Sequence, residues 1–391
     1  MKRFSGQYVI TNTGLPIKRA VITTADDGTI LNVENTSGNL REESSTEYHN
    51  GIIIPGFVNC HCHLELSHMK GSISKGTGLG NFIGNIRNNR DLSKESVHRS
   101  SFSADNYMFR EGTVLCADIC NTSDTFGLKK ESKIKYINLI EVFGLDQEKA
   151  GRRMSEAKKV SETARENDLP HFLVPHSVYS MSLTLLRMLK NECLSNVVTS
   201  IHFMETPAEE SFLKERNGNL MTTYELSGLL PEILETAVSH EDAILNEVTS
   251  SGNLILVHNT FIGRETLRKL NVRKNLFYCL CPNSNLYIEN KLPPAGLLMD
   301  EGCNIVVGTD SLASNYALSI LEELKTLQYN FQGLKLEDLV AWATINGARA
   351  LASADTFGSI EPGKKPGLLV LENVDLQNMK LLPESFVTRL I

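Results

Sequence analysis

The sequence predicts an α/β fold, namely a (β/α)8 TIM barrel flanked by a small β-sandwich domain that the N- and C-terminal segments form together. Two observations support this prediction. Through the middle of the 391-residue chain, eight apolar, strand-like runs alternate with stretches of helical periodicity, as in such barrels. Both ends instead carry short apolar runs between turn residues, and neither end has enough apolar residues for a core of its own.

The terminal segments are predicted to pair with each other. The N-terminal segment alternates apolar runs, such as residues 7–10, with turn clusters such as residues 26–28. The C-terminal segment has a turn-rich stretch at 358–363, followed by the apolar run 368–371. We therefore predict a composite β-sandwich from residues 1–54 and 356–391, and a metal-dependent barrel from residues 55–355.

The elements of the barrel follow from the pattern along the chain. Its strands are predicted, in order, at residues 52–60, 113–120, 135–143, 171–176, 197–203, 254–258, 276–281 and 304–310. Helices are predicted at 149–167, 182–191 and 316–329, and the segment 336–352 closes the ring. The loop over residues 64–90 contains five glycines, which predicts a mobile loop that closes over the substrate.

Composition and charge exclude several classes of protein. The chain has 39 basic and 46 acidic residues, a net charge of −7, which argues against a nucleic-acid surface. No apolar run approaches the roughly 20 residues that span a bilayer, so no membrane partner is expected. The N-terminus lacks the apolar stretch of a secretory signal, and the eight cysteines are expected to be reduced thiols in the cytoplasm.

Histidines gather at the predicted strand ends. Five of the ten lie there, at positions 61, 63, 176, 202 and 258. In barrels of this kind, the carboxyl ends of the strands carry the active site. The other five histidines, at positions 49, 68, 98, 171 and 240, have no such context, and we expect structural or surface roles for them.

Four of the strand-end residues suit a metal. His61 and His63 are two residues apart in an extended segment, so both side chains point to the same side. His-x-His alone is a weak signal, because a hydrogen-bonded polar pair is the ordinary alternative. His202 and Asp310 lie at the ends of strands five and eight, and three imidazoles with one carboxylate suit zinc or iron. Cys60 and Cys62 alternate to the opposite face, so we expect them to be buried structural thiols.

Three further polar residues have open assignments. Glu205 follows His202 by three residues, and is either a solvated surface residue or a group that moves protons to and from the substrate. His258 is either a ligand or a hydrogen-bond donor. His176 either contacts the substrate or supports its loop.

Several motifs together resemble the metal-dependent amidohydrolase superfamily. The segments concerned are 55–63, 202–205, 257–258, 281–285, 308–311 and 358–364, so the resemblance covers nearly the whole chain. Within the superfamily, His202-x-x-Glu205 is similar to the group of cytosine and guanine deaminases and chlorohydrolases. The segment 63–67, His-Leu-Glu-Leu-Ser, further resembles the aminodeoxyfutalosine deaminases. One departure is 365–367, Lys-Pro-Gly, where the superfamily usually has Ala-Asp.

The resemblance implies a mononuclear hydrolase. One divalent ion, Zn²⁺ or Fe²⁺, would be held by His61, His63, His202 and Asp310. Strand four has no lysine for the carboxylated bridge of binuclear relatives, which supports one ion. The implied reaction is deamination of an amino-substituted heterocycle with release of ammonia. Asp310 would orient and deprotonate the attacking water, and Glu205 would protonate the ring and assist the departure of ammonia, while His258 would hydrogen-bond the attacking oxygen.

The resemblance also points to a small-molecule substrate, an adenosine-like nucleoside such as aminodeoxyfutalosine. Glu65 and His176, together with His258, are the predicted substrate contacts; the alternative for Glu65 is a solvated residue at the start of the loop. A homo-oligomer is compatible with the sequence.

Two other functions stay open at this stage. The same site could cleave a cyclic amide or displace another leaving group, as guanine deaminases, cytosine deaminases and chlorohydrolases do. A non-catalytic scaffold is the alternative from another class, and the complete ligand set speaks against it. A phosphate-binding barrel is disfavoured, because no glycine-rich loop follows strand seven or eight.

Overall fold

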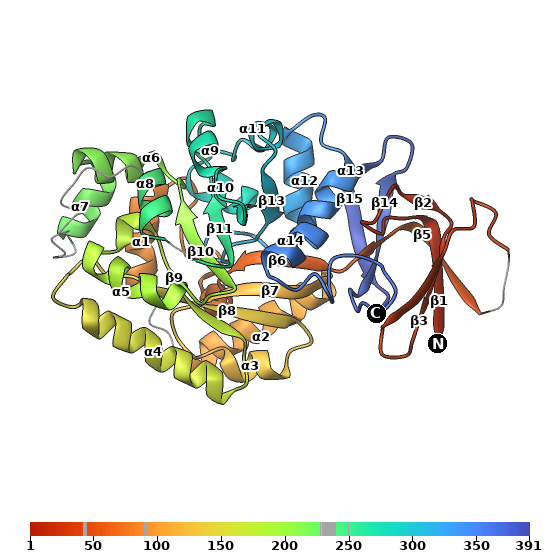
Figure 1. The fold of residues 1–391 in the computed structure, drawn as a ribbon, viewed down its shortest axis with the longest axis horizontal. Helices are drawn as coiled ribbons and strands as arrows, with labels where there is room; N and C mark the ends of the chain where they lie inside the picture. The colour runs from red at the N-terminus through yellow and green to blue at the C-terminus, as the bar shows by residue number, and fades with distance from the viewer. Residues whose placement is uncertain (42–44, 90–92, 227, 229–239, 249) are drawn as a thin grey trace.

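Figure 1 shows the computed structural model of the chain, in which a barrel of strands and helices adjoins a sheet that contains both chain ends. The structure describes residues 1–41, 45–89, 93–226, 228, 240–248 and 250–391. Within these residues, no helix has the length and apolar character needed to cross a bilayer.

Eight parallel strands form the barrel, as predicted. They are β6 (Phe57–Cys62), β7 (Thr113–Cys120), β8 (Lys135–Val142), β9 (His171–Pro175), β10 (Val198–Phe203), β11 (Asn253–His258), β12 (Leu276–Leu280) and β13 (Asn304–Val307). Hydrogen bonds join them in two four-stranded parallel sheets, β6 to β9 and β10 to β13. All the residues of β7, β10 and β12 are buried, which fits strands covered on both faces.

The two sheets meet at predicted site residues. Between β9 and β10, the His202 backbone N–H donates to the His176 carbonyl at 2.8 Å. Between β13 and β6, the backbone N–H groups of Thr309 and Asp310 both lie 3.0 Å from the His61 carbonyl. The backbone contacts that join the sheets therefore also position the side chains of the site.

The first predicted strand is in fact two strands, which corrects the range 52–60. β5 (Thr46–Pro55) belongs to the terminal sheet and ends before Gly56, and β6 of the barrel begins directly after this glycine. A Cβ at Gly56 would lie 2.3 Å from Val114 and 2.7 Å from the Pro366 carbonyl oxygen, so only glycine fits where the chain passes from sheet to barrel.

Helices follow the barrel strands. They are α1 (Gly78–Asn89), α2 (Lys94–Arg110), α3 (Phe126–Glu131), α4 (Ala150–Glu166), α5 (Leu183–Cys193), α6 (Pro207–Glu210), α7 (Gly218–Leu226), α8 (His240–Asn246), α9 (Arg264–Leu270), α10 (Pro282–Ile288), α11 (Ala295–Asp300), α12 (Ile320–Asn330), α13 (Leu336–Ala341) and α14 (Gly347–Ala350). Short 3₁₀ turns, η1 (Leu64–Met69) and η2 (Val178–Ser180), and π turns, η3 (Ser211–Glu215) and η4 (Trp342–Asn346), complete the set.

The predicted helix at 316–329 begins later than expected. The Asn315 side chain accepts the backbone N–H of Tyr316 at 2.7 Å, which holds that residue in a turn. Ser319 then caps α12 by accepting the N–H of Glu322. Local side-chain acceptors thus displace the helix start by four residues.

The two chain ends pair with each other, as predicted, in one seven-stranded sheet, and its description as a composite β-sandwich stays a prediction. Its order is β15 (Lys380–Arg389), β14 (Leu368–Asp375), β5, β1 (Lys2–Val9), β3 (Val21–Thr24) and β4 (Ile30–Glu34), with β2 (Ile17–Lys18) paired to β1. It has a core of its own that includes Phe4, Ile22 and Val370. The division into units 1–54 with 356–391, and 55–355, stays a prediction.

All eight cysteines are free, and seven are buried. The Cys62 sulfur lies 4.0 Å from the Met108 sulfur of α2. A Cβ at Gly347, where α14 begins, would lie 3.1 Å from the Cys60 sulfur. Both thiols therefore pack beneath helices, as predicted.

Candidate active site

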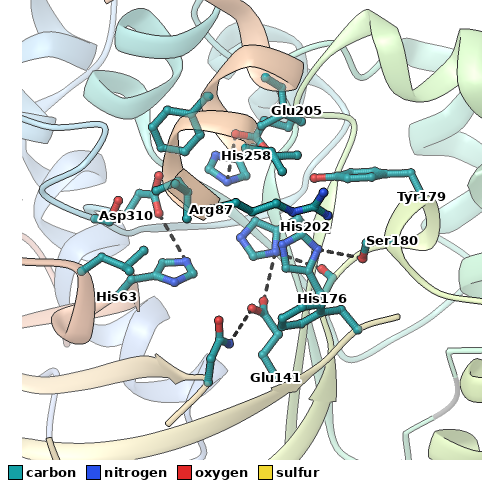
Figure 2. Close-up of a pocket in the computed structure, with 18 of the residues that line it drawn as sticks. His63, Arg87, Glu141, His176, Tyr179, Ser180, His202, Glu205, His258 and Asp310 are labelled. Carbon is teal, nitrogen blue, oxygen red and sulfur yellow. Dashed lines mark hydrogen bonds and ion pairs between the residues drawn. The ribbon is translucent and has the colours of Figure 1, made fainter. Parts of the chain in front are cut away.

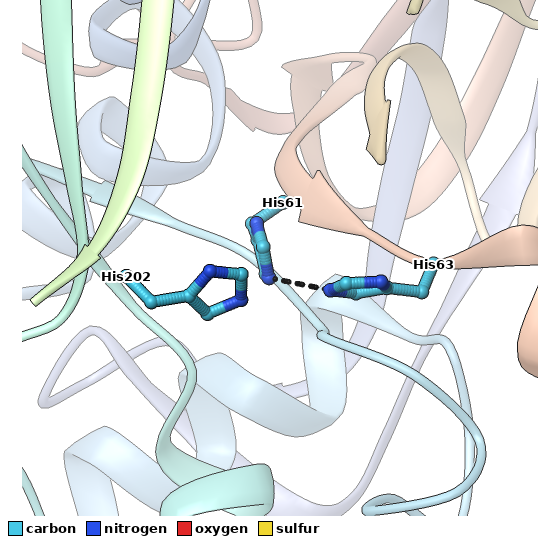
Figure 3. A group of neighbouring side chains, drawn as sticks. All are labelled: His61, His63 and His202. Atoms are coloured by element: carbon cyan, nitrogen blue, oxygen red, sulfur yellow. Dashed lines mark hydrogen bonds between the residues drawn. The ribbon is translucent and has the colours of Figure 1, made fainter. Parts of the chain in front are cut away.

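Three imidazoles converge at the carboxyl ends of β6 and β10. The ligand nitrogens of His61, His63 and His202 all lie within 4.8 Å of one another, and His61 Nε2 is 3.1 Å from His63 Nε2 (Figure 3). His61 and His63 point the same way because they alternate along β6, and all three side chains are buried.

Asp310, the fourth predicted ligand, lies beside two of these imidazoles. Its Oδ1 lies 3.6 Å from His61 Nε2 and 3.4 Å from His63 Nε2. Tetrahedral ligands about 2.0–2.1 Å from Zn²⁺ lie about 3.3–3.4 Å from one another, so these spacings suit a single ion. The residues present therefore fit the metal that the ligand pattern predicts.

Hydrogen bonds orient the Asp310 carboxylate. Ser284 and Ser314 each donate to Oδ2 at 2.6 Å, which leaves Oδ1 directed at the imidazoles. Asp310 has a left-handed backbone conformation, φ 56°, and His258 has φ 78°. Such backbone conformations are unfavourable for residues other than glycine and concentrate at functional sites.

The Nδ1 atom of His202 is engaged in hydrogen bonding. Its Nδ1 lies 2.9 Å from the His176 carbonyl oxygen and 3.5 Å from Glu141 Oε1. The carbonyl accepts the Nδ1 proton, so Nε2 is left to bind a metal. Asn121 holds the other Glu141 oxygen at 3.0 Å, and the sequence had not indicated Glu141.

His258 and Glu205 face each other beside the three-histidine cluster. Glu205 Oε1 lies 3.6 Å from His258 Nε2. The Asn285 amide nitrogen is 3.0 Å from His258 Nδ1 and donates to it, which leaves the proton on Nε2, toward the cavity. Glu209 accepts the backbone N–H of Glu205 at 2.7 Å and so holds the loop after β10.

The two carboxyl groups of the site differ in acidity. Burial, followed by the charge of Asp310, raises the pKa of Glu205 well above its usual value. Burial also acts to raise the pKa of Asp310, but His61, His63 and His258 outweigh it and hold that pKa well below its usual value. Divergent values for two neighbouring carboxyl groups are typical of an acid and a base in one active site.

A cavity opens over these groups (Figure 2). The predicted residues His63, His176, His202, Glu205, His258 and Asp310 line it. His176 stacks on His202 with ring centres 4.6 Å apart, and its Nδ1 lies 2.9 Å from the hydroxyl oxygens of Ser177 and Ser180. These contacts involve Nδ1 and not Nε2, and a substrate role for His176 stays a prediction.

α1, within the predicted loop 64–90, forms one wall of the cavity. Its lining residues are Leu79, Phe82, Ile83, Ile86 and Arg87. Most of the predicted loop therefore folds into η1 and α1 instead of irregular chain. Arg90, at the predicted end of the loop, lies outside the described residues.

Glu65 is not itself among the residues that line the cavity. Its buried Oε2 accepts the backbone N–H groups of Asn121 and Thr122 at 3.2 and 3.1 Å, and the Thr122 hydroxyl at 3.1 Å. These contacts hold the end of β7, and a substrate role for Glu65 stays a prediction. Of the supporting groups, Ser284 and Asn285 lie in the motif 281–285, which the sequence marked without indicating their roles.

Comparison with known proteins gives the family. The model of the Amidohydrolase family matches residues 52–388. The chain belongs to the Amidohydrolase family. Adenosine deaminase of Helicobacter pylori is 27% identical to it, over 83% of this chain and 79% of that protein. A 5-methylthioadenosine/S-adenosylhomocysteine deaminase of Pyrococcus abyssi is 26% identical, over 85% of this chain and 76% of that protein.

Solved structures show the same fold. The aminofutalosine deaminase of Helicobacter pylori, in complex with methylthio-coformycin, superimposes with a TM-score of 0.78 over all of both chains, at 22% identity. The predicted TIM-barrel fold is thereby confirmed, and the match to the family model confirms membership of the amidohydrolase family.

This amidohydrolase is expected to bind about one equivalent of Zn²⁺ or Fe²⁺, because the three imidazoles lie within 4.8 Å of one another and Asp310 Oδ1 lies 3.4–3.6 Å from two of them. Elemental analysis of the purified protein measures the number of metal ions per chain. His61→Ala and His202→Ala should lose metal, whereas His98→Ala, an exposed residue of α2, should retain it. Two equivalents in one joint site would contradict the mononuclear assignment.

Mild acid is expected to destabilise the metal-free amidohydrolase. Burial and nearby charges lower the pKa of His202 to about 3 and that of His176 to about 4. Unfolded histidine has a pKa of about 6.5, so below that pH the unfolded chain takes up protons that the folded chain does not. The free energy of unfolding should therefore fall between about pH 6.5 and pH 4, by up to about 1.4 kcal/mol per pH unit for each histidine.

Thermal melts of chelator-treated protein at pH 7.5, 6 and 5 measure this loss. The same melts with excess Zn²⁺ are the control, because the bound ion would hold the imidazoles in their neutral form at pH 7.5 and 6. A Tm that stays constant without metal over this interval would contradict the lowered pKa values.

Proposed function

We propose that this protein is a metal-dependent hydrolytic deaminase of an amino-substituted purine nucleoside, an adenosine-like compound such as aminodeoxyfutalosine. The observation that carries the proposal is the pair of buried carboxyl groups with opposite pKa shifts, of which Glu205 lies 3.6 Å from His258 Nε2 and Asp310 lies 3.4 Å from His63 Nε2. Water adds to the carbon that bears the amino group, and ammonia leaves.

The residues divide the proton transfers between them. A divalent ion held by His61, His63, His202 and Asp310 would lower the pKa of a water molecule in the cavity to near neutrality. Asp310, which is ionised, orients the attacking water and takes its proton. Glu205, protonated because of its raised pKa, donates its proton to the ring nitrogen. It then takes up the proton of the added hydroxyl group as the carbonyl forms, while the proton held by Asp310 passes to the departing amine. His258 donates a hydrogen bond from Nε2 to the attacking oxygen, an interaction that strengthens toward the transition state.

The names of the relatives support the choice of substrate. The similar proteins are deaminases of adenosine and of 5-methylthioadenosine or S-adenosylhomocysteine, and one structural neighbour is an aminofutalosine deaminase. In this chain, His176 offers Nε2 to a sugar hydroxyl beside the cluster.

Ammonia release from a panel of purines, pyrimidines, pterins and 5′-modified adenosines tests the proposal. Aminodeoxyfutalosine or another 5′-modified adenosine should be turned over, with free guanine and cytosine poorer by about 100-fold or more, since they lack the sugar contacts. Turnover of guanine or cytosine without any activity on adenosine derivatives would overturn the substrate and keep the deaminase chemistry. No ammonia from any compound of the panel would favour the cyclic-amide or chlorohydrolase alternative.

We further propose a cytoplasmic protein. Light scattering, which gives the molar mass in solution, tests whether the protein forms the homo-oligomer with which its sequence is compatible.

A further inference from the structure

Two separate segments orient Asp310 and His258. Ser284, in α10, and Ser314, in the loop after β13, each donate to Asp310 Oδ2 at 2.6 Å. Asn285, also in α10, donates to His258 Nδ1 at 3.0 Å. The directions of the Asp310 carboxylate and the His258 imidazole therefore depend on how α10 is placed relative to the loop after β13.

Glu323, on α12, joins these two segments. It is fully buried. Its Oε2 accepts the backbone N–H of Asn283 at 2.9 Å, and its Oε1 accepts the side-chain amide of Asn315 at 2.8 Å. These two residues directly adjoin the two serines that donate to Asp310. One carboxyl group thus holds both segments at the points from which the serines reach the metal site.

Further hydrogen bonds strengthen the same junction. The Asn315 amide nitrogen also donates to the Thr309 carbonyl at 2.8 Å, which closes the loop after β13 on itself. The Thr326 hydroxyl, almost one helical turn after Glu323, donates to Asn283 Oδ1 at 2.6 Å. α12 therefore binds the beginning of α10 by a carboxylate and a hydroxyl group, and the carboxylate also reaches the loop.

Glu323 is not among the residues that line the active-site cavity. Burial, together with the charge of Asp310, raises the pKa of Glu323 to about 8, against the hydrogen bonds that it accepts. A buried carboxyl group is unfavourable unless its oxygens are hydrogen-bonded, and here both oxygens are used to join the two segments. The location of this group therefore indicates a role in fixing those segments relative to each other.

Resting on the proposed function, we infer that Glu323 is a positioning residue of the deamination. It holds α10 and the loop after β13 together, so that the Asp310 carboxylate faces the attacking water and the His258 imidazole faces the attacking oxygen. Glu323 acts on these groups through Asn283 and Asn315, which it binds directly.

Glu323→Gln tests this inference in the metal-loaded protein, with the best substrate of the ammonia panel. Glutamine keeps the shape of the side chain, but its NH₂ group cannot accept one of the two N–H groups. We expect kcat at saturating Zn²⁺ to fall about 10- to 100-fold, as for other groups that orient metal ligands. KM should stay within about twofold, because Asp310 and His258 act in the chemical step and not in substrate binding.

Two further variants separate positioning from stability. Glu322→Gln alters the neighbouring carboxylate, which is exposed and pairs with Lys325 at 2.7 Å, and it should leave kcat unchanged. Thr326→Val removes the hydroxyl on Asn283 and keeps Glu323, so it should lower kcat by a smaller factor with KM unchanged. Thermal melts check that each variant is folded, and Thr326→Val carries the test if Glu323→Gln does not fold.

The double variant Glu323→Gln/Ser314→Ala tests whether both residues act on the same carboxylate. Each change loosens the contacts of Asp310 Oδ2, so the combined loss in kcat should be clearly smaller than the product of the two single losses. A change that only destabilised the fold would lower the Tm without this coupling.

Three results would overturn the inference: an unchanged kcat in folded, metal-loaded Glu323→Gln, a loss that lies wholly in KM, or single losses that multiply in full. If Glu323→Gln does not fold, an unchanged kcat in Thr326→Val overturns it. If the unaltered protein deaminates no compound of the panel, the proposed function fails, and the visible spectrum of the Co²⁺-loaded protein decides. A shift in Glu323→Gln but not in Glu322→Gln would support the placing of Asp310 by Glu323, and identical spectra would overturn it.

Discussion

Glu205→Gln is expected to keep its metal and to lose about 10²–10⁴-fold in kcat, the usual contribution of general acid–base catalysis. Glu205 Oε1 lies 3.6 Å from His258 Nε2, and the described ligand cluster of His61, His63 and His202 does not include Glu205. The glutamine amide has nearly the same shape but cannot deliver a proton to the ring. Single-turnover kinetics and elemental analysis of the same preparation measure the two quantities.

Glu209→Gln is the matched control for this variant. Its carboxylate accepts the backbone N–H groups of Met204, Glu205 and Thr206. The change therefore weakens the hydrogen bonds that hold this loop but retains the carboxyl group of Glu205. A smaller loss than in Glu205→Gln is expected. A Glu205→Gln protein that is folded but metal-free would show that Glu205 is a ligand.

Asp310→Asn is expected to lose both metal occupancy and rate, with kcat/KM reduced by at least about 10²–10⁴-fold. The amide removes the charge that faces His61 and His63, and it cannot take a proton from water. Elemental analysis together with kinetics at saturating Zn²⁺ separates the two losses, because added metal should restore occupancy more fully than activity.

Ser314→Ala provides the comparison for Asp310. It removes one of the two hydroxyl groups on Oδ2 and retains the ligand oxygen Oδ1. A loss of about 10–100-fold in metal affinity or activity is expected, as for other groups that orient metal ligands. Full activity and full occupancy in Asp310→Asn would exclude the carboxylate from both roles.

The sequence by itself determined the barrel and grouped the candidate metal ligands. Alternating apolar runs locate strands, and polar residues at their carboxyl ends must meet at one face of a parallel barrel. His61, His63, His202 and Asp310 could therefore be grouped from positions far apart in the chain, and the structure brings them within ligand distance.

Only the tertiary structure decided which side chains surround that cluster. Glu65 follows the metal motif directly but turns to the end of β7, whereas Glu141, which had no motif, lies beside His202. Likewise, α1 brings Arg87 to the cavity from near the end of the predicted glycine-rich loop 64–90. The physical reason is that strand ends follow from local periodicity, while the direction of a side chain beyond a strand depends on hydrogen bonds and packing with distant segments.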